Sequence, residues 1–545
     1  MFVDIYRAKG KNGYIYDITF NPIIDFNILK STRNVKSMEI IAQRIEFQYA
    51  YSVIKSIYKM PAFLARLTAN SRDISNIVFK RSKLKIKCSP IKYEKVDISN
   101  SDLSKIEEII IGRIISLERL IEISKNLGYE RGDTINIIQA LYCERRIKMM
   151  PSRINRKNER ICNISKKKAC KDCSMGFKRD DILLYAADNY NVKITRNINI
   201  KKMELERMYN DAKVGVNNFI KLKNSNCSII CAPGAFEVEV LSEPLGSIIK
   251  NGGRILFITS NISMRKVEEG FKNSIEGVKV KIIGDEFVNF RDFDICISSY
   301  ENYKCFHKAF DVVVLDYMKA FIKEPPKNFI CTAKRGAKEG GKFIFISCSG
   351  DELKNEKIDG SKIMIPVSQH KNPIIEPRIV VSKVLNDETP FIPEMAAEII
   401  EWSISRNIRV FIFVPDEEKL RKVYFYITEI MKCKSDLVQI STEKEKDGIA
   451  YFRKGICSIL ISSDLKDALL NFDNVNVIVM YSDCEFYTLN RLINLSAIAV
   501  EKNFNKFDTR QVLYVGSQES EEMSLAQKKI RYLNEVGWEK GYLKK

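Results

Sequence analysis

Cys231-Ala-Pro-Gly-Ala-Phe-Glu-Val-Glu239 is the stretch that decides the fold. It follows an apolar run, residues 228–231, which is typical of a buried strand. A helical run continues to about residue 249, with Pro244 as a predicted kink. Strand, tight turn and helix together form the setting in which backbone N–H groups cradle phosphate at a helix N-terminus. The stretch therefore predicts an α/β lobe with a loop of the phosphate-binding shape.

The side chains of this loop differ from those that a nucleotide needs. A phosphate loop carries small residues, a Lys for the β- and γ-phosphates and a Ser or Thr for magnesium. Gly234 and Ala235 are small, but Phe236 replaces a Gly, Glu237 stands at the Lys position and Val238 at the hydroxyl position. At about 4 Å and an effective dielectric near 20, exchanging the cation for an anion turns roughly 4 kcal/mol of attraction into similar repulsion. The loop either never held a nucleotide or has lost the means to do so.

Composition indicates a globular protein with a polyanionic partner. The chain has 545 residues, enough for three or four domains, with 45% hydrophobic and 29% charged residues. Its formal net charge is +20, which favours nucleic acid as a partner. A general preference for Lys and Ile in the source organism is the alternative explanation of this charge.

Location and redox state follow from what the sequence lacks. Residues 1–7 do not show the basic-then-apolar plan of a signal peptide, and no run of 18 apolar residues predicts a membrane span. We therefore expect a cytoplasmic protein, in which the 14 Cys do not form a disulfide framework. With only two His, His307 and His370, His-based metal sites and Ser-His-Asp chemistry have little to draw on.

A basic segment, residues 141–183, holds a candidate zinc site. Cys170 and Cys173 have the Cys-x2-Cys spacing of a zinc knuckle, whereas Cys143 and Cys162 lack a second Cys at that spacing. Four thiolates could still close one Zn²⁺ site, and a solvated basic loop with incidental Cys remains the alternative. In either case the Lys and Arg of this segment suit contacts with a phosphate backbone.

Short, nearly continuous apolar runs alternate with helical stretches from about residue 201 to the end, a pattern typical of parallel sheets covered on both faces. The runs form two sets, which predict one lobe over 200–368 and another over 369–545. Residues 1–140 suggest an α+β region, with weak alternation in 1–35 and helical spacing in 36–58 and roughly 102–125, the latter capped by Ser101 or Asp102. Residues 184–200 suggest a connector. The expected strands are 228–231, 255–259, 278–283, 295–298, 312–315, 343–347, 410–414, 437–440, 458–462, 477–480 and 511–515.

Several phrases, in order, resemble the late-competence ComFA family of DNA-uptake proteins over roughly residues 140–540. They are Cys170-x2-Cys173-Ser-Met-Gly176, Gly234-Ala235, Val312-Val-Val-Leu-Asp-Tyr-Met-Lys-Ala-Phe321, Ser347-Cys-Ser349, Pro373, Glu376-Pro-Arg378, Phe411-Ile-Phe-Val-Pro415 and Phe452-Arg-Lys-Gly455. The resemblance implies two tandem RecA-like lobes of a superfamily 2, DEAD/DEAH-type helicase behind a zinc-finger-like segment. It also implies ATP with Mg²⁺, single-stranded DNA and other DNA-uptake proteins as ligands and partners.

The departures from this family fall on its chemistry. Asp316 is kept, but Tyr317 replaces the Glu that such an ATPase needs beside it, and Lys319 replaces a later Asp. Ala497 and Val500 stand where the second lobe of the family supplies arginines. A Glu-Arg-Gly of that lobe is Asp467-Ala-Leu469 here, and no Gln lies between residues 190 and 368 to contact a base.

These departures lead to one preferred hypothesis and two alternatives. The preferred hypothesis is a pseudo-ATPase that holds single-stranded DNA, with Gly234, Ala235, Glu237 and Asp316 as a vestigial nucleotide site and no catalytic residues. The first alternative is a working ATP-dependent translocase in which other residues replace the lost ones. The second is a protein–protein scaffold for uptake or recombination factors.

Overall fold

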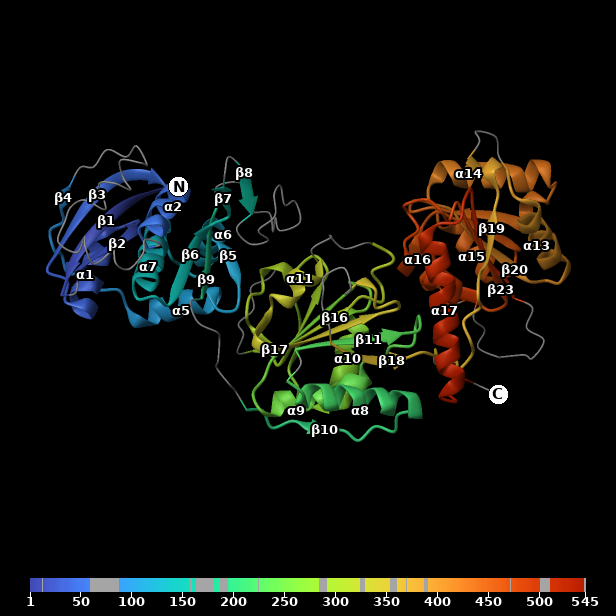
Figure 1. Cartoon of the computed structure of the whole chain (residues 1–545), viewed down its shortest axis with the longest axis horizontal. Coiled ribbons are helices and arrows are strands. Elements are labelled where there is room, and N and C mark those ends of the chain that lie inside the picture. Colours follow the sequence, from blue (N-terminus) through green and yellow to red (C-terminus); the bar gives the residue numbers. More distant parts are fainter. Residues whose placement is uncertain are drawn as a thin grey trace.

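Three parts of the chain lie in a row in Figure 1, in a computed structural model of the protein. An N-terminal region lies on the left, a seven-stranded sheet with its helices (the first lobe) in the centre, and a six-stranded sheet with its helices (the second lobe) on the right. The structure describes residues 1–11, 13–58, 88–156, 159–162, 181–186, 195–223, 225–283, 292–323, 329–352, 360–368, 370–386, 391–470, 472–499 and 510–543.

The N-terminal region begins with an antiparallel sheet in the order β2-β1-β3-β4. Its elements are β1 (Phe2–Gly10), β2 (Gly13–Thr19), α1 (Pro22–Arg33), β3 (Ser37–Glu46), α2 (Phe47–Tyr58) and β4 (Ser89–Pro90). The helical expectation for 36–58 is therefore wrong in its first half. Residues 37–46 form a strand because Met38, Ile40 and Ala42 pair with β1 and are buried there.

A second, three-stranded sheet follows in the order β5-β9-β6. Its elements are α5 (Asn100–Ile110), β5 (Ile114–Ser116), α6 (Leu117–Asn126), α7 (Arg131–Cys143), β6 (Ile147–Pro151) and β9 (Ile182–Ala186). The single helix expected over roughly 102–125 is broken by β5, because Gly112 takes a left-handed φ of +70° that ends α5. Ser99, rather than Ser101 or Asp102, caps α5. The expected connector 184–200 contains the end of β9, which is the central strand of this sheet.

The sheet of the first lobe is parallel throughout, in the order β14-β15-β12-β16-β17-β11-β18. Its strands are β11 (Asn226–Cys231), β12 (Ile255–Thr259), β14 (Val280–Ile283), β15 (Ile295–Ser299), β16 (Phe310–Asp316), β17 (Ala337–Ser347) and β18 (Ser361–Ile365). One face packs on α8 (Arg207–Lys221), α9 (Glu239–Lys250) and α10 (Met264–Ser274), and the other on α11 (Phe329–Lys334). A short antiparallel pair, β10 (Asn199–Ile200) and β13 (Ile275–Glu276), forms a separate sheet that contacts α9 and α10.

The sheet of the second lobe is also parallel, in the order β19-β24-β23-β20-β22-β21. Its strands are β19 (Arg378–Val381), β20 (Arg409–Phe413), β21 (Val438–Ser441), β22 (Ile459–Ser462), β23 (Val475–Met480) and β24 (Val512–Gly516). The helices are α13 (Glu394–Ser405), α14 (Glu417–Phe425), α15 (Asp447–Arg453), α16 (Leu489–Ser496) and α17 (Glu521–Glu539). The two sets of apolar runs predicted two tandem parallel α/β lobes, and the structure confirms them.

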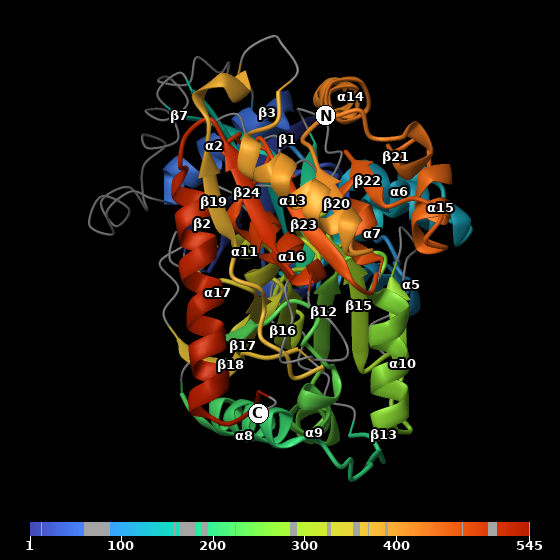
Figure 2. The same ribbon diagram turned by 90° about the vertical axis from the view of Figure 1, so that its right-hand side faces the viewer.

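The C-terminal helix α17 fastens the second lobe to the first. In Figure 2 it runs alongside both sheets and ends beside α8. The Nζ atom of Lys529 lies 3.0 Å from the Asp351 carboxylate, which follows β17, and donates to the carbonyl of Ser349 at 3.1 Å. Beyond the helix, the Tyr542 hydroxyl donates to Asp211 on α8 at 2.5 Å. One apolar core cluster consequently runs through both lobes.

Candidate functional site

The loop after β11 has the expected shape of a tight turn into a helix. Gly234 has a left-handed φ of +73°, and a Cβ at this position would meet no other atom within 4 Å. Its neighbour Ala235 is fully buried and donates its N–H to the carbonyl of Ala232 at 3.0 Å. The tight turn that the sequence predicts between strand and helix is therefore present.

Glu237 occupies the pocket that this turn lines. The pocket, which we call the interlobe pocket, has a volume of about 320 Å³ and reaches Asn494 of the second lobe. Burial raises the pKa of Glu237, although Lys266 on α10 lowers it from 3.6 Å away. Because the Lys266 side chain is 74% exposed, this ion pair is worth about 0–1 kcal/mol.

Acidic side chains outnumber basic ones around the interlobe pocket. Four carboxylates, from Glu237, Glu239, Glu269 and Asp316, line it, against the ammonium groups of Lys266 and Lys319. Burial lowers the pKa of Lys319, which weakens it as a permanent cation. The pocket therefore presents a surface on which an anion meets net negative charge.

Asp316 lies at the carboxyl end of β16, where the Thr259 hydroxyl donates to it at 2.7 Å and the Met318 N–H at 3.0 Å. Burial raises its pKa. Tyr317 lies against Phe345 and Phe329, with ring centroids 5.5 and 6.0 Å apart. The side chain at the position of the family's catalytic Glu thus joins an aromatic cluster and supplies no carboxylate.

Arg491 on α16 is the arginine of the second lobe that approaches the first, and it is already engaged. Its Nε donates to the carbonyl of Phe321 at 2.8 Å, and its Nη1 donates to the carbonyl of Phe486. The guanidinium lies 4.3 Å from the centre of the Phe486 ring and is 9% exposed. Its Nε donor joins the two lobes, and Arg491 does not line the interlobe pocket.

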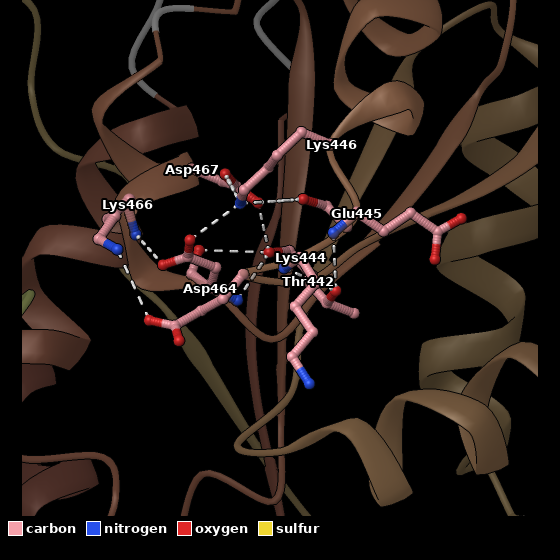
Figure 3. A network of polar contacts seen from close by, with 10 residues as sticks. Thr442, Lys444, Glu445, Lys446, Asp464, Lys466 and Asp467 are labelled. Carbon is pink, nitrogen blue, oxygen red and sulfur yellow. Dashed lines mark hydrogen bonds and ion pairs between the residues drawn. The ribbon is translucent and has the colours of Figure 1, made fainter.

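A polar network closes the carboxyl ends of β21 and β22 in the second lobe (Figure 3). The ammonium of Lys446 lies 2.7 Å from Asp467 and 2.9 Å from Asp464. The hydroxyls of Ser441 and Ser462 donate to the other oxygen of Asp467 at 2.6 and 2.7 Å. Burial lowers the pKa of Lys446, but its hydrogen bonds with Asp467 and Asp464 outweigh this and raise it. The position of the family's Glu-Arg-Gly motif here holds two loops together.

The structure describes two of the four cysteines that were expected to bind zinc. Cys143 is the last residue of α7, and its Sγ lies 4.0 Å from the carbonyl oxygen of Asp25; burial raises the pKa of this thiol. Cys162 ends β8 (Glu159–Cys162), which pairs with β7 (Arg153–Arg156). Cys170 and Cys173 lie outside the described residues. Within the described ranges, no three His, Cys, Asp or Glu side chains gather closely enough to hold a metal ion.

Sequence reasoning placed Gly234, Glu237 and Asp316 near one another, and the structure brings all three to the interlobe pocket. It did not single out Lys266, because its proximity to Glu237 depends on how α10 packs on α9. It also did not find Lys446, which is separated from its two carboxylate partners by 18 and 21 residues. A Lys before a helix, followed by two Asp after the next strand, is too common a pattern to predict a network.

Two parallel α/β lobes with a strand-turn-helix pocket between them define a helicase-like class of protein. No protein-family model matches the chain. Competence protein ComFA of Bacillus subtilis (strain 168) is 22% identical over 312 residues, which cover 56% of this chain and 66% of that protein. Competence protein ComFA of Streptococcus pneumoniae (strain ATCC BAA-255 / R6) is 22% identical over 274 residues, 48% of this chain and 62% of that protein. The chain is similar to these two ComFA proteins over about half of its own length, and it spans slightly less than two thirds of each of them.

Two solved structures overlap loosely with the chain. A single-residue variant of S. cerevisiae Dbp5 bound to RNA and ADP BeF3 is 11% identical, with a TM-score of 0.38, and covers 62% of this chain and 93% of its own. S. cerevisiae Dbp5 bound to RNA and ADP BeF3 is 12% identical, with the same TM-score of 0.38 and the same coverage of 62% and 93%. Among the described residues, every helix is too short or too polar to cross a membrane.

Proposed function

We propose that this competence-related, helicase-like protein is a pseudo-ATPase that grips single-stranded DNA without a nucleotide cycle. The observation that carries the proposal is the side chain of Glu237, which lines the interlobe pocket at the position of the phosphate-binding Lys. The ammonium of Lys266, 3.6 Å away, is mostly exposed and only offsets the charge of Glu237. The residues present do not fit ATP with Mg²⁺.

The charge of the pocket supports this proposal. A triphosphate would approach four carboxylates, and each unit charge at about 4 Å is worth roughly 4 kcal/mol at an effective dielectric near 20. Magnesium would offset part of this repulsion. However, Asp316 is buried with a raised pKa, and its oxygens already accept hydrogen bonds from Thr259 and Met318.

The side chains that stand nearest to the expected catalytic Glu and arginine positions make other contacts in this protein. Arg491 donates to two main-chain carbonyls, and Tyr317 packs among aromatic rings. Phosphoryl transfer depends on positioning and electrostatic stabilisation. A protein without these groups therefore retains little catalytic activity. The lobes are better suited to a fixed grip, since α17 joins them through Lys529 and Tyr542.

Excess positive charge supports nucleic acid as the ligand. The net charge is +20 although the interlobe pocket is acidic, so the cations lie on other surfaces. Affinity for single-stranded DNA should then be dominated by phosphate contacts and fall about a hundredfold between 50 and 300 mM salt for roughly four contacts. Fluorescence anisotropy with a labelled oligonucleotide measures this. An affinity that does not change with salt contradicts the proposal.

The absence of turnover is tested separately. Purified protein with single-stranded DNA, ATP and Mg²⁺ should release no phosphate above the background of an Asp316→Ala variant. Turnover that DNA stimulates and Asp316→Ala abolishes would instead support the translocase. A pull-down of DNA-uptake proteins with and without nuclease separates a DNA grip from a protein scaffold, because only DNA-bridged partners are lost on digestion.

A further inference from the structure

A second pocket lies beside the interlobe pocket and shares two residues with it. It has a volume of about 320 Å³, and we call it the acidic pocket. Its lining comes from the segment before α8, from the first turn of α8 and from the start of α9: Met203, Glu204, Leu205, Glu206, Tyr209, Glu237 and Glu239. Among the described residues, no basic side chain lines it, in a protein with a net charge of +20.

Tyr209 is the observation that points to a ligand. Its side chain is 5% exposed, and its hydroxyl has no hydrogen-bond partner among the residues that the structure describes. Burial raises the pKa of this phenol, as do the charges of Glu237, Glu206 and Glu239, which line the same pocket. A buried polar group without a partner costs about 1–3 kcal/mol, so this hydroxyl gains from a ligand that bonds to it.

The carboxylates of the acidic pocket divide into paired and unpaired groups. Glu206 lies 3.1 Å from the ammonium of Lys371, and Glu237 lies 3.6 Å from that of Lys266. Glu204 and Glu239 have no ion pair within the described part of the chain, and one oxygen of Glu239 is buried without a partner. Two lining carboxylates, those of Glu204 and Glu239, therefore remain for a cation.

The spread of these carboxylates selects the kind of cation. They do not gather closely enough to hold one metal ion. Several separated cationic groups satisfy them better, and the apolar side chains of Met203, Leu205 and Tyr209 suit the methylene groups between those charges. The shared residues Glu237 and Glu239 let an extended ligand continue into the interlobe pocket, where Glu269 adds a further carboxylate.

We propose that the acidic pocket binds a small linear polyamine, whose ammonium groups pair with Glu204 and Glu239 and donate a hydrogen bond to the Tyr209 oxygen. The proposed site rests on the charge of the acidic pocket and does not depend on DNA binding.

Spermidine is the probe, titrated calorimetrically into the full-length protein without nucleic acid, at matched ionic strength. We expect saturable binding that Tyr209→Phe weakens about tenfold, the effect of one hydrogen bond to a charged group. Glu239→Gln should weaken it at least as much. Glu243→Gln, on the same helix but outside both pockets, is the matched control and should leave affinity unchanged.

Folding is checked independently, since Tyr209→Phe removes a hydroxyl without a partner and should not lower the thermal unfolding temperature. No saturable spermidine binding overturns the inference, as does binding that is unchanged by both pocket variants. Equal affinity for Mg²⁺ or for adenosine, lost through the same variants, would also overturn it in favour of a metal or a nucleobase. DNA binding is measured in a separate titration, so its failure would contradict the proposed function and leave this result intact.

Discussion

The carboxylate of Glu237 and the hydroxyl of Tyr209 contribute to neighbouring pockets, yet only the first could be foreseen. Glu237 stands at a fixed offset from Gly234 in a strand-turn-helix pattern, and that offset predicts its place. Tyr209 lies 28 residues before Glu237 on another helix, and its contact with the pocket depends on how α8 packs against α9. Local spacing predicts local geometry, whereas contacts between distant helices need the fold itself.

Asp25 illustrates the same limit in the N-terminal region. It is 1% exposed and accepts hydrogen bonds from the Gln139 amide at 2.8 and 2.9 Å. Burial raises its pKa to about 7. The folded state thus binds this proton more tightly than the unfolded chain, whose Asp has a pKa of about 3.9. The stability that Asp25 contributes is full below that value and is lost as pH rises towards 7.

Asp25→Asn should therefore stabilise helices α1 and α7 at pH 8 by a few kcal/mol at most, roughly 1–4, and have little effect at pH 4. Hydrogen exchange of peptides from α1 and α7, compared between variant and wild type at each pH, measures this. Asp133→Asn, at an exposed position of α7, is the control. Equal protection of wild type and Asp25→Asn at pH 8 would contradict the assignment.

The strands of the two lobes were predicted closely because each is a short apolar run buried on both faces. The expected strand 255–259 matches β12 (Ile255–Thr259), and most others differ by one or two residues at their ends. β18 and β19 were missed. β18 begins with the polar pair Ser361 and Lys362, and β19 is a four-residue strand whose end residues, Arg378 and Val381, are exposed. In the N-terminal region the spacing of apolar residues predicted a helix where a strand stands. The strand β3 is followed directly by the helix α2, so their apolar residues form one continuous pattern in the sequence.

The network around Lys446 gives the loops after β21 and β22 a fixed arrangement (Figure 3). Lys446→Met should leave Asp464 and Asp467 buried without their cation. We expect a loss of about 2 kcal/mol, less than the roughly 3–5 kcal/mol of a fully buried pair, because the Lys446 side chain is 39% exposed.

Chemical unfolding followed by hydrogen exchange in β21 and β22 measures this loss. Lys444→Met removes a neighbouring, exposed Lys and should change stability by less than about 0.5 kcal/mol. Similar losses in the two variants would show that the Lys446 contacts do not stabilise the lobe.

The three parts of the molecule are joined by a few polar contacts as well as by packing. α17 joins the lobes, and a short contact joins the N-terminal region to the first lobe. In that contact the main-chain N–H of His307 donates to the carbonyl of Gly112 at 2.9 Å. The His307 ring meets the Tyr185 ring of β9 edge-on, with ring centroids 5.4 Å apart. Arg113 also forms an isolated bridge with Phe306. His307 therefore lies at the junction of the N-terminal region and the first lobe.

Acid should loosen the junction. Burial, together with the charges of Arg335, Lys308 and Lys148, lowers the pKa of His307 to about 4. Since an unfolded His has a pKa of about 6.5, the stability from neutral His307 is present above that value and is lost as pH falls towards 4. His307→Phe keeps the ring contact and should remove this dependence. Hydrogen exchange of β9 and of residues 303–307, measured across this pH range, reports the stability of the junction. His370→Phe is the control. Identical acid responses in wild type and His307→Phe would contradict this.

The central claim is that the interlobe pocket repels a triphosphate, and the affinity of the full-length protein for ATP with Mg²⁺ tests it most directly. The account predicts a Kd weaker than about 1 mM for the wild type. Glu237→Lys should tighten binding at least about tenfold, since it replaces repulsion by attraction. Glu243→Lys, an equal charge change on α9 at a position that pairs with Lys213 and lines neither pocket, should not. Micromolar binding of ATP by the wild type, unimproved by Glu237→Lys, would contradict the account.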